Sequence, residues 1–100
     1  MSSNLHSLYQ AILACRDPQE LQNFLRDLLT ENEMSEMAER WTAARMLSEG
    51  ASYVQVIEKT GMSSTTVARV AAWLNKGTGG YKKALARTSP KKKKTETKSC

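Results

Sequence analysis

Residues 52–76 read SYVQVIEKTGMSSTTVARVAAWLNK, and they carry the most specific indication of the fold. Its pattern predicts a helix over 53–60, a turn at Gly61, and a second helix from Ser64 to about Asn75 with Ser63 as its cap. Val56 and Ile57 face inward before the turn, and Met62 fills the junction. The second helix has a buried stripe of Val67, Val70, Ala71 and Leu74. Two short helices around a glycine are the plan of a helix-turn-helix, here at about 52–76.

The second helix directs small and polar side chains away from its apolar stripe. The candidate DNA-binding residues are Ser63, Ser64, Thr65, Thr66, Ala68 and Arg69. Hydroxyls bond phosphates or base edges, methyl groups contact thymine, and Arg binds guanine or phosphate. Ile57 is bulky and Thr60 is polar where such motifs commonly carry a small and an apolar residue. By itself, the segment is equally compatible with an ordinary helix pair.

Two strongly amphipathic helices precede this segment. Their stripes have helical spacing and comprise Leu5, Leu8, Tyr9, Ile12 and Leu13, then Leu21, Phe24, Leu25, Leu28 and Leu29. Asp17, Pro18 and Glu20 predict the start of the second helix, with Asp17 as N-cap and Glu20 closing a capping box. The stripes are too short to enclose a core alone, which favours a partner subunit.

A third helix is expected from a Thr30–Glu33 capping box to about Ser48, ending near Gly50. One of its faces carries Met34, Met37, Ala38, Trp41 and Arg45. Trp41 and Trp73 could stack on a ligand, but their helical spacing makes them core residues. No segment shows the alternation of a strand, so the fold class is all-α.

The charge is concentrated at the end of the chain. Residues 1–80 carry seven Lys and Arg against nine Asp and Glu, whereas residues 81–100 carry eight against one. We expect one domain over 1–87, with a further short helix at 81–87, and a disordered basic tail over 88–100. Lys91, Lys92, Lys93 and Lys94 would contact phosphates without sequence preference.

Several function classes are excluded by what the sequence lacks. Cys15 and Cys100 have no metal-type spacing, His6 has no companion ligand, and Gly77 to Gly80 lack the Lys-Ser/Thr of a phosphate-binding loop. No nucleophile and base pattern predicts an enzyme, and no apolar run is long enough to span a membrane. We therefore expect a cytoplasmic protein with no catalytic residues, no metal and no cofactor.

The arrangement of the whole chain resembles the Trp repressor superfamily. The residues that carry the likeness are Leu28 to Arg40, Ser48-Glu49-Gly50, Ser52-Tyr53, Glu58 to Ser63 and Thr65 to Val70. The YerC/YecD branch is similar through Leu74-Asn75 and Gly79-Gly80-Tyr81 as well, so the resemblance covers roughly residues 5–85. It implies an intertwined homodimer that presents two helix-turn-helix heads to successive major grooves of duplex DNA.

The resemblance also implies an effector pocket at Thr30, Arg40 and Arg69, which match the residues that hold the amino-acid corepressor of the Trp repressor. Each has a simpler explanation: helix capping for Thr30, ion pairs with Glu36 or Glu33 for Arg40, and phosphate contact for Arg69. Where the repressor has a glycine that admits the indole, this chain has Val70. We therefore expect that tryptophan is not a corepressor, and any small-molecule effector is unidentified.

The sequence thus favours a homodimeric, sequence-specific transcriptional regulator, in particular a repressor. Two alternatives stay open. One is a nucleic-acid-binding module of low sequence specificity that depends on the basic tail. The other is a protein-interaction domain on a helix-turn-helix scaffold, which the excess of acidic residues in 1–80 favours.

Overall fold

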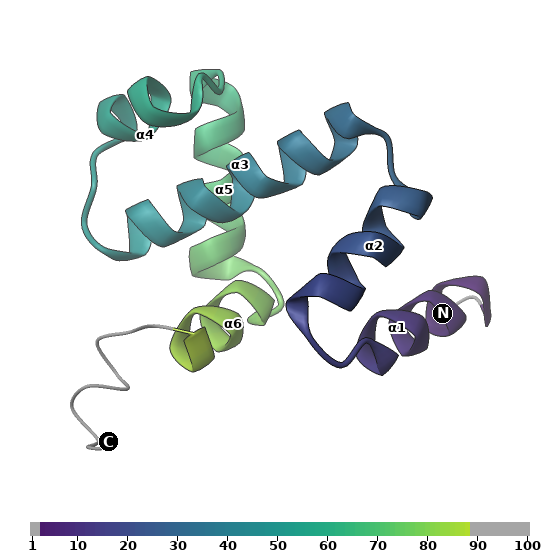
Figure 1. The fold of residues 1–100 in the computed structure, drawn as a ribbon. Helices are drawn as coiled ribbons and strands as arrows, with labels where there is room; N and C mark the ends of the chain where they lie inside the picture. The colour runs from purple at the N-terminus through teal and green to yellow at the C-terminus, as the bar shows by residue number, and fades with distance from the viewer. Residues whose placement is uncertain (1–2, 89–100) are drawn as a thin grey trace, which may run out of the picture. The chain divides into compact units, whose positions relative to one another are not determined.

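A computed structural model describes residues 3–88 of the chain, and these residues form six helices and no strand (Figure 1). The helices are α1 (Ser3–Ala14), α2 (Pro18–Leu28), α3 (Glu31–Ser48), α4 (Tyr53–Thr60), α5 (Ser64–Lys76) and α6 (Gly80–Thr88). The predicted all-α class is confirmed. Apart from Thr88, which ends α6, the expected basic tail with Lys91 to Lys94 lies outside the described residues. No helix within 3–88 is both long and apolar enough to cross a membrane.

Helices α2 and α3 begin where their capping residues predict. The Asp17 carboxylate accepts a hydrogen bond from the Glu20 amide at 2.9 Å, and Pro18 is the first residue of α2. Glu20 does not close the expected box on the Asp17 amide, because its long side chain reaches one residue further and accepts from the Arg16 amide. That bond still ties the entering chain to the first turn of α2.

The Thr30–Glu33 capping box at the start of α3 is confirmed. The Glu33 amide donates to the Thr30 hydroxyl at 3.1 Å, and the Thr30 amide donates to the Glu33 carboxylate at 2.9 Å. Helix α3 ends at Ser48, and Gly50 follows with φ +98°. The capping box and the left-handed Gly50 mark the two ends of the helix at the positions that the sequence predicts.

The described part of the chain divides into two compact units, with the boundary between Met37 and Ala38. In the first unit, no residue of α1 or α2 is buried. Leu13 is 82% exposed, and Leu5, Tyr9 and Leu28 remain between 44% and 49% exposed. Helix α1 also carries no Asp, Glu, Lys or Arg. The two predicted stripes therefore form, but one chain leaves them largely uncovered.

The second unit contains the buried core. Its central cluster consists of Ala43, Ala44, Val56, Met62, Val67 and Val70. Helix α3 contributes two alanines to this core, whereas the face suggested by its larger residues leaves Met37 47% exposed and Arg45 exposed. A search for large apolar residues at helical spacing does not identify alanine as a core residue. The small side chain of alanine nevertheless lets two helices approach closely and pack without voids.

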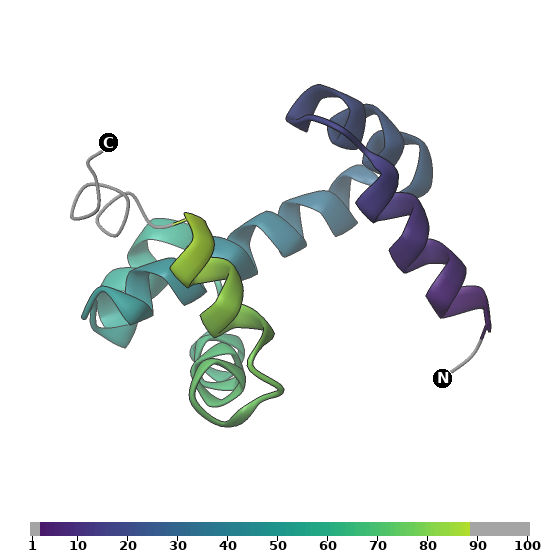
Figure 2. The same cartoon turned by 90° about the horizontal axis from the view of Figure 1, so that it is seen from below.

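The two tryptophans differ in their environment. The predicted core position of Trp73 is wrong, since Trp73 is 45% exposed; it precedes Leu74 by one residue, which is about 100° around the helix from the buried stripe. Trp41 is half-buried, and its ring stacks on Tyr81 of α6 with centroids 6.4 Å apart. Helix α6 also packs beside the C-terminal end of α5, and Figure 2 views α5 nearly along its axis.

Candidate nucleic-acid interface

The turn between α4 and α5 has the backbone geometry that the sequence predicts. Gly61 has φ +76°, in the left-handed region, and its amide donates to the Ile57 carbonyl at 2.8 Å. A Cβ atom added at Gly61 would meet nothing within 4 Å, so the conformation, not a lack of space, favours glycine here. Met62 follows and is buried as expected, with 8% of its surface exposed.

Both helices of the motif begin at serine caps. Ser52 and Gln55 form a complete capping box at the start of α4. At the start of α5, the Ser63 hydroxyl oxygen accepts from the Thr66 amide at 3.1 Å and lies 2.9 Å from the Thr66 hydroxyl oxygen. The hydroxyls of Ser63 and Thr66 are therefore already occupied in shaping the first turn, and Thr66 is half-buried.

Besides the Ser63 cap, which is also exposed, four of the candidate contact residues face solvent. Ser64, Thr65, Ala68 and Arg69 are exposed, while Val67 and Val70 between and beside them have no exposed surface. The predicted division of α5 into an outward and a buried face is confirmed. The Ser64 and Thr65 amides have no hydrogen-bond partner within residues 3–88, as expected for the first turn of a helix. Such free amides bind anions readily.

The two departures from the usual motif are accommodated by the packing. Ile57 is half-buried and lies against the core cluster. Thr60 is also half-buried; its hydroxyl donates to the Val56 carbonyl at 2.8 Å and accepts from the Met62 amide at 3.2 Å. A polar residue is tolerated in the turn because both of its hydrogen-bonding roles are filled.

The charge of the described chain changes sign at the turn. Residues 61–88 carry five basic side chains and no acidic one, whereas residues 3–60 carry five basic side chains and nine acidic ones. The basic residues are Arg69, Lys76, Lys82, Lys83 and Arg87. Helices α5 and α6 therefore present a positive field, independently of the basic tail.

The three residues of the implied effector pocket differ in their local contacts. Thr30 caps α3. The side chains of Arg40 and Arg69 are exposed and make no hydrogen bond or ion pair with another residue of 3–88, so the expected pairing of Arg40 with Glu36 or Glu33 is wrong. The Glu33 carboxylate instead accepts from the Thr30 amide.

Val70 lies in the core cluster with Ala43 and Ala44 of α3 and has no exposed surface. The two methyl groups of its side chain therefore occupy space between α3 and α5. Side-chain volume at this position closes the junction that a glycine would leave open.

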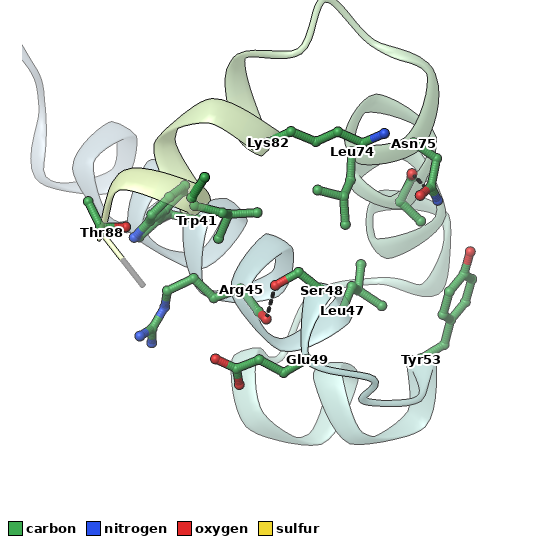
Figure 3. A pocket seen from close by; sticks show the side chains of 13 residues that line it. Trp41, Arg45, Leu47, Ser48, Glu49, Tyr53, Leu74, Asn75, Lys82 and Thr88 are labelled. Atoms are coloured by element: carbon green, nitrogen blue, oxygen red, sulfur yellow. Dashed lines mark hydrogen bonds between the residues drawn. The ribbon is translucent and has the colours of Figure 1, made fainter. Parts of the chain in front are cut away.

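A groove that sequence analysis missed lies between the end of α3, the end of α5 and α6 (Figure 3). Its volume is about 960 Å³, and Trp41, Leu47, Leu74 and Leu85 supply apolar lining. Lys82 extends along it toward Asn75 in Figure 3. Thr30, Arg40 and Arg69 do not line it. Tyr53, the first residue of α4, lines it as well, so periodicity within single helices could not reveal a groove whose walls come from four helices.

No group of three or more His, Cys, Asp or Glu side chains in residues 3–88 is arranged to hold a metal ion. Cys15, the one cysteine in this range, is a free thiol. The described part of the chain presents the N-terminal end of α5 to solvent. The Gly61 turn joins this helix to α4, which begins at the Ser52 capping box.

These features define an all-helical helix-turn-helix protein. Residues 3–89 match the family model of the Trp repressor protein, and the chain therefore belongs to the Trp repressor family. This is a family of transcription regulators, not of enzymes.

Individual relatives agree with this assignment. The protein YerC of Bacillus subtilis (strain 168) is 41% identical over 95 residues, which are 95% of this chain and 88% of YerC. The crystal structure of a TrpR-like protein from Eubacterium eligens ATCC 27750 has a TM-score of 0.83 and 37% identity, covering 86% of this chain and 89% of that one. A structure from Staphylococcus aureus has a TM-score of 0.82 and 31% identity, covering 87% of each chain. The expected resemblance to the YerC branch is confirmed.

Proposed function

We propose that this protein is a sequence-specific, DNA-binding transcription regulator of the cytoplasm, and in particular a repressor, that acts as a homodimer through α4 and α5. The observation that carries the proposal is the exposed surface of Ser64, Thr65, Ala68 and Arg69 on a helix whose opposite side is fully buried. A rigidly seated helix that presents small side chains can enter the major groove of B-DNA.

Each exposed group of α5 has a separate role in this proposal. The amides of Ser64 and Thr65 and the Ser64 hydroxyl bind a phosphate at the edge of the groove. The Thr65 hydroxyl and the Thr65 and Ala68 methyl groups contact base edges, and Arg69 binds a guanine edge or a phosphate. Ser63 and Thr66 act indirectly, since their hydroxyls hold the first turn in shape.

The test is to select a preferred duplex from a random DNA pool and to measure its affinity for variants of α5. Thr65→Ala and Arg69→Ala should each weaken binding by about 1 to 3 kcal/mol, which is roughly 5- to 150-fold, where a base contact is lost. Lys76→Ala is the matched control, because Lys76 is an exposed cation at the other end of the same helix. Lys76→Ala should weaken binding to all duplexes by about the same factor, and this factor should be smaller than those of Thr65→Ala and Arg69→Ala on the selected duplex.

The same experiment separates the alternatives. A protein that binds every duplex with equal affinity, with a steep dependence on salt, would be a nucleic-acid-binding module of low specificity. A protein that retains no duplex at low salt would be a protein-interaction domain. Full affinity in both α5 variants on a selected site would place the reading surface elsewhere.

The homodimer is supported by the apolar surface that one chain leaves exposed. The stripes of α1 and α2 have no buried residue, and an uncharged twelve-residue helix such as α1 is poorly suited to face water. A second copy that covers these stripes would bury apolar area on both chains, and the groove beside Trp41, Leu74 and Leu85 offers a surface of matching chemistry.

Sedimentation equilibrium at low micromolar concentration tests the dimer. The expected mass is twice the 11.1 kDa of the chain. Leu13→Glu, which places a carboxylate at the most exposed leucine of α1, should shift the equilibrium toward monomer, whereas Gln10→Glu at an exposed polar position of α1 should not. A wild-type monomer at this concentration would refute the dimer without bearing on the α5 surface.

We further infer that DNA binding by this protein requires no tryptophan corepressor. The side chain of Val70 is fully buried against a core that includes two residues of α3, so the junction between α3 and α5 is filled by the protein itself. In the DNA-free protein, α5 should therefore keep one orientation relative to α3 without a ligand. A gel-shift series with and without tryptophan should show the same affinity.

A further inference from the structure

We infer that Thr60 is a positioning residue for the DNA-reading helix: its hydroxyl fixes the angle between α4 and α5 by bonding both sides of the turn at once. The inference rests on the proposed function for its effect on DNA, and on the geometry of the turn alone for its effect on the protein. Thr60 does not belong to the exposed contact surface of α5.

Thr60 makes two hydrogen bonds, one on each side of the turn. Its Oγ1 donates to the Val56 carbonyl, one turn back in α4, at 2.8 Å. The same oxygen accepts from the Met62 amide, beyond Gly61, at 3.2 Å. A single hydroxyl with one proton and two lone pairs can fill both roles simultaneously. It therefore bridges the end of α4 to the residue that precedes the cap of α5.

Without the Thr60 bridge, the turn at Gly61 would be free to change its conformation. Gly61 has open space around it and the widest backbone freedom of any residue, so side-chain contacts do not fix its conformation. Its amide bonds back to Ile57, which completes α4 but does not reach α5. The Thr60 hydroxyl is the polar contact among residues 3–88 that holds the Met62 amide.

Burial makes the bridge consequential. Val56 has no exposed surface and Met62 has 8%, so the groups that Thr60 bonds lie at the edge of the core and not in bulk water. Loss of the hydroxyl would leave the Met62 amide without its acceptor in a place where water substitutes poorly. The turn would then shift to expose that amide, and α5 would rotate relative to α4.

The test compares Thr60→Val, which keeps the shape and removes the hydroxyl, with Thr60→Ser, which keeps the hydroxyl. Thr88→Val is the matched control, because Thr88 donates to the Ala84 carbonyl at 2.8 Å in the same way at the end of α6 but is exposed and bridges no turn. Residual dipolar couplings on the DNA-free protein would report the relative orientation of α4 and α5. Thr60→Val should change it, and Thr60→Ser and Thr88→Val should not.

The second readout is the ratio of the affinity for a selected duplex to the affinity for random duplex. This ratio should fall about tenfold in Thr60→Val, which corresponds to one misplaced base contact, while non-specific binding stays unchanged. Thr60→Ser should restore it. A residue that only stabilises the fold would leave the ratio unchanged under conditions in which the variant is fully folded.

The outcomes distinguish this inference from the function on which it rests. A wild-type protein without a preferred duplex would refute the proposed function, and the dipolar couplings would then decide the role of Thr60 alone. An unchanged α4–α5 orientation in Thr60→Val would overturn the inference, as would an unchanged affinity ratio on a wild type that does select a site. Should Thr60→Val fail to fold, Thr60→Ala, which adds no methyl groups beside the unbonded Met62 amide, takes its place in both measurements.

Discussion

Two valines of α4 allow a matched test of where this domain derives its stability. Val56 has no exposed surface and lies in the core cluster, while Val54, two residues earlier on the same helix, is 63% exposed. Val56→Ala and Val54→Ala make the same chemical change in the same helix. A difference between them therefore reports burial, not helix propensity.

The magnitude follows from the methyl groups removed. Valine to alanine deletes two methyl groups, which are worth about 0.8 kcal/mol each when fully buried, and the cavity left behind adds up to about 1 kcal/mol. Alanine is the better helix former by about 0.6 kcal/mol, which offsets part of this loss. Val56→Ala should thus lower the free energy of unfolding by about 2 kcal/mol. For Val54→Ala, the small loss of burial and the gain in propensity nearly cancel.

Urea titrations followed by far-ultraviolet circular dichroism measure both changes. All variants must be compared at one protein concentration, because a homodimer gains apparent stability from mass action. Equal losses of unfolding free energy in the two variants would contradict the assignment of this stability to the burial of Val56. A loss of about 2 kcal/mol in Val54→Ala alone would show that its face of α4 is covered by another molecule.

Four other changes test separate parts of the structure. Gly61→Ala should destabilise the protein by about 1 kcal/mol in the same titration, because alanine is strained at φ +76° although no atom blocks its Cβ. Gly77→Ala should cost more, since its Cβ would clash with the Trp73 carbonyl oxygen and α5 would have to end differently; equal costs for the two glycines would contradict this. Isothermal titration with tryptophan should give no saturable binding to the wild type, whereas Val70→Gly, if it remains folded, opens the volume beside α3 and is the variant in which binding should appear. Deletion of residues 89–100 should weaken binding to all duplexes together and make the salt dependence shallower; a change in the preferred site would show that these residues read sequence.

The sequence by itself determined the helices and their ends. Caps and turn glycines act through bonds that span three or four residues, so Ser63, Thr30 and Gly61 could be assigned their roles before any tertiary contact was known. The buried stripe of α5 was equally accessible, because a repeat of 3.6 residues fixes which side chains share a face. The exposed surface at Ser64, Thr65, Ala68 and Arg69 followed as its complement.

Which faces of the helices are buried, and which together form a groove, depends on the tertiary structure. It buried Ala43 and Ala44 where the larger residues of α3 suggested another face, left Trp73 exposed, and assembled a groove from four helices. Close approach of two helices depends on small side chains at the contact and on the angle at which the helices cross. The hydrophobic periodicity of one segment predicts neither of them. The Thr60 bridge is of the same kind: a polar residue that looks out of place in the sequence is satisfied because folding places a carbonyl and an amide on either side of its hydroxyl.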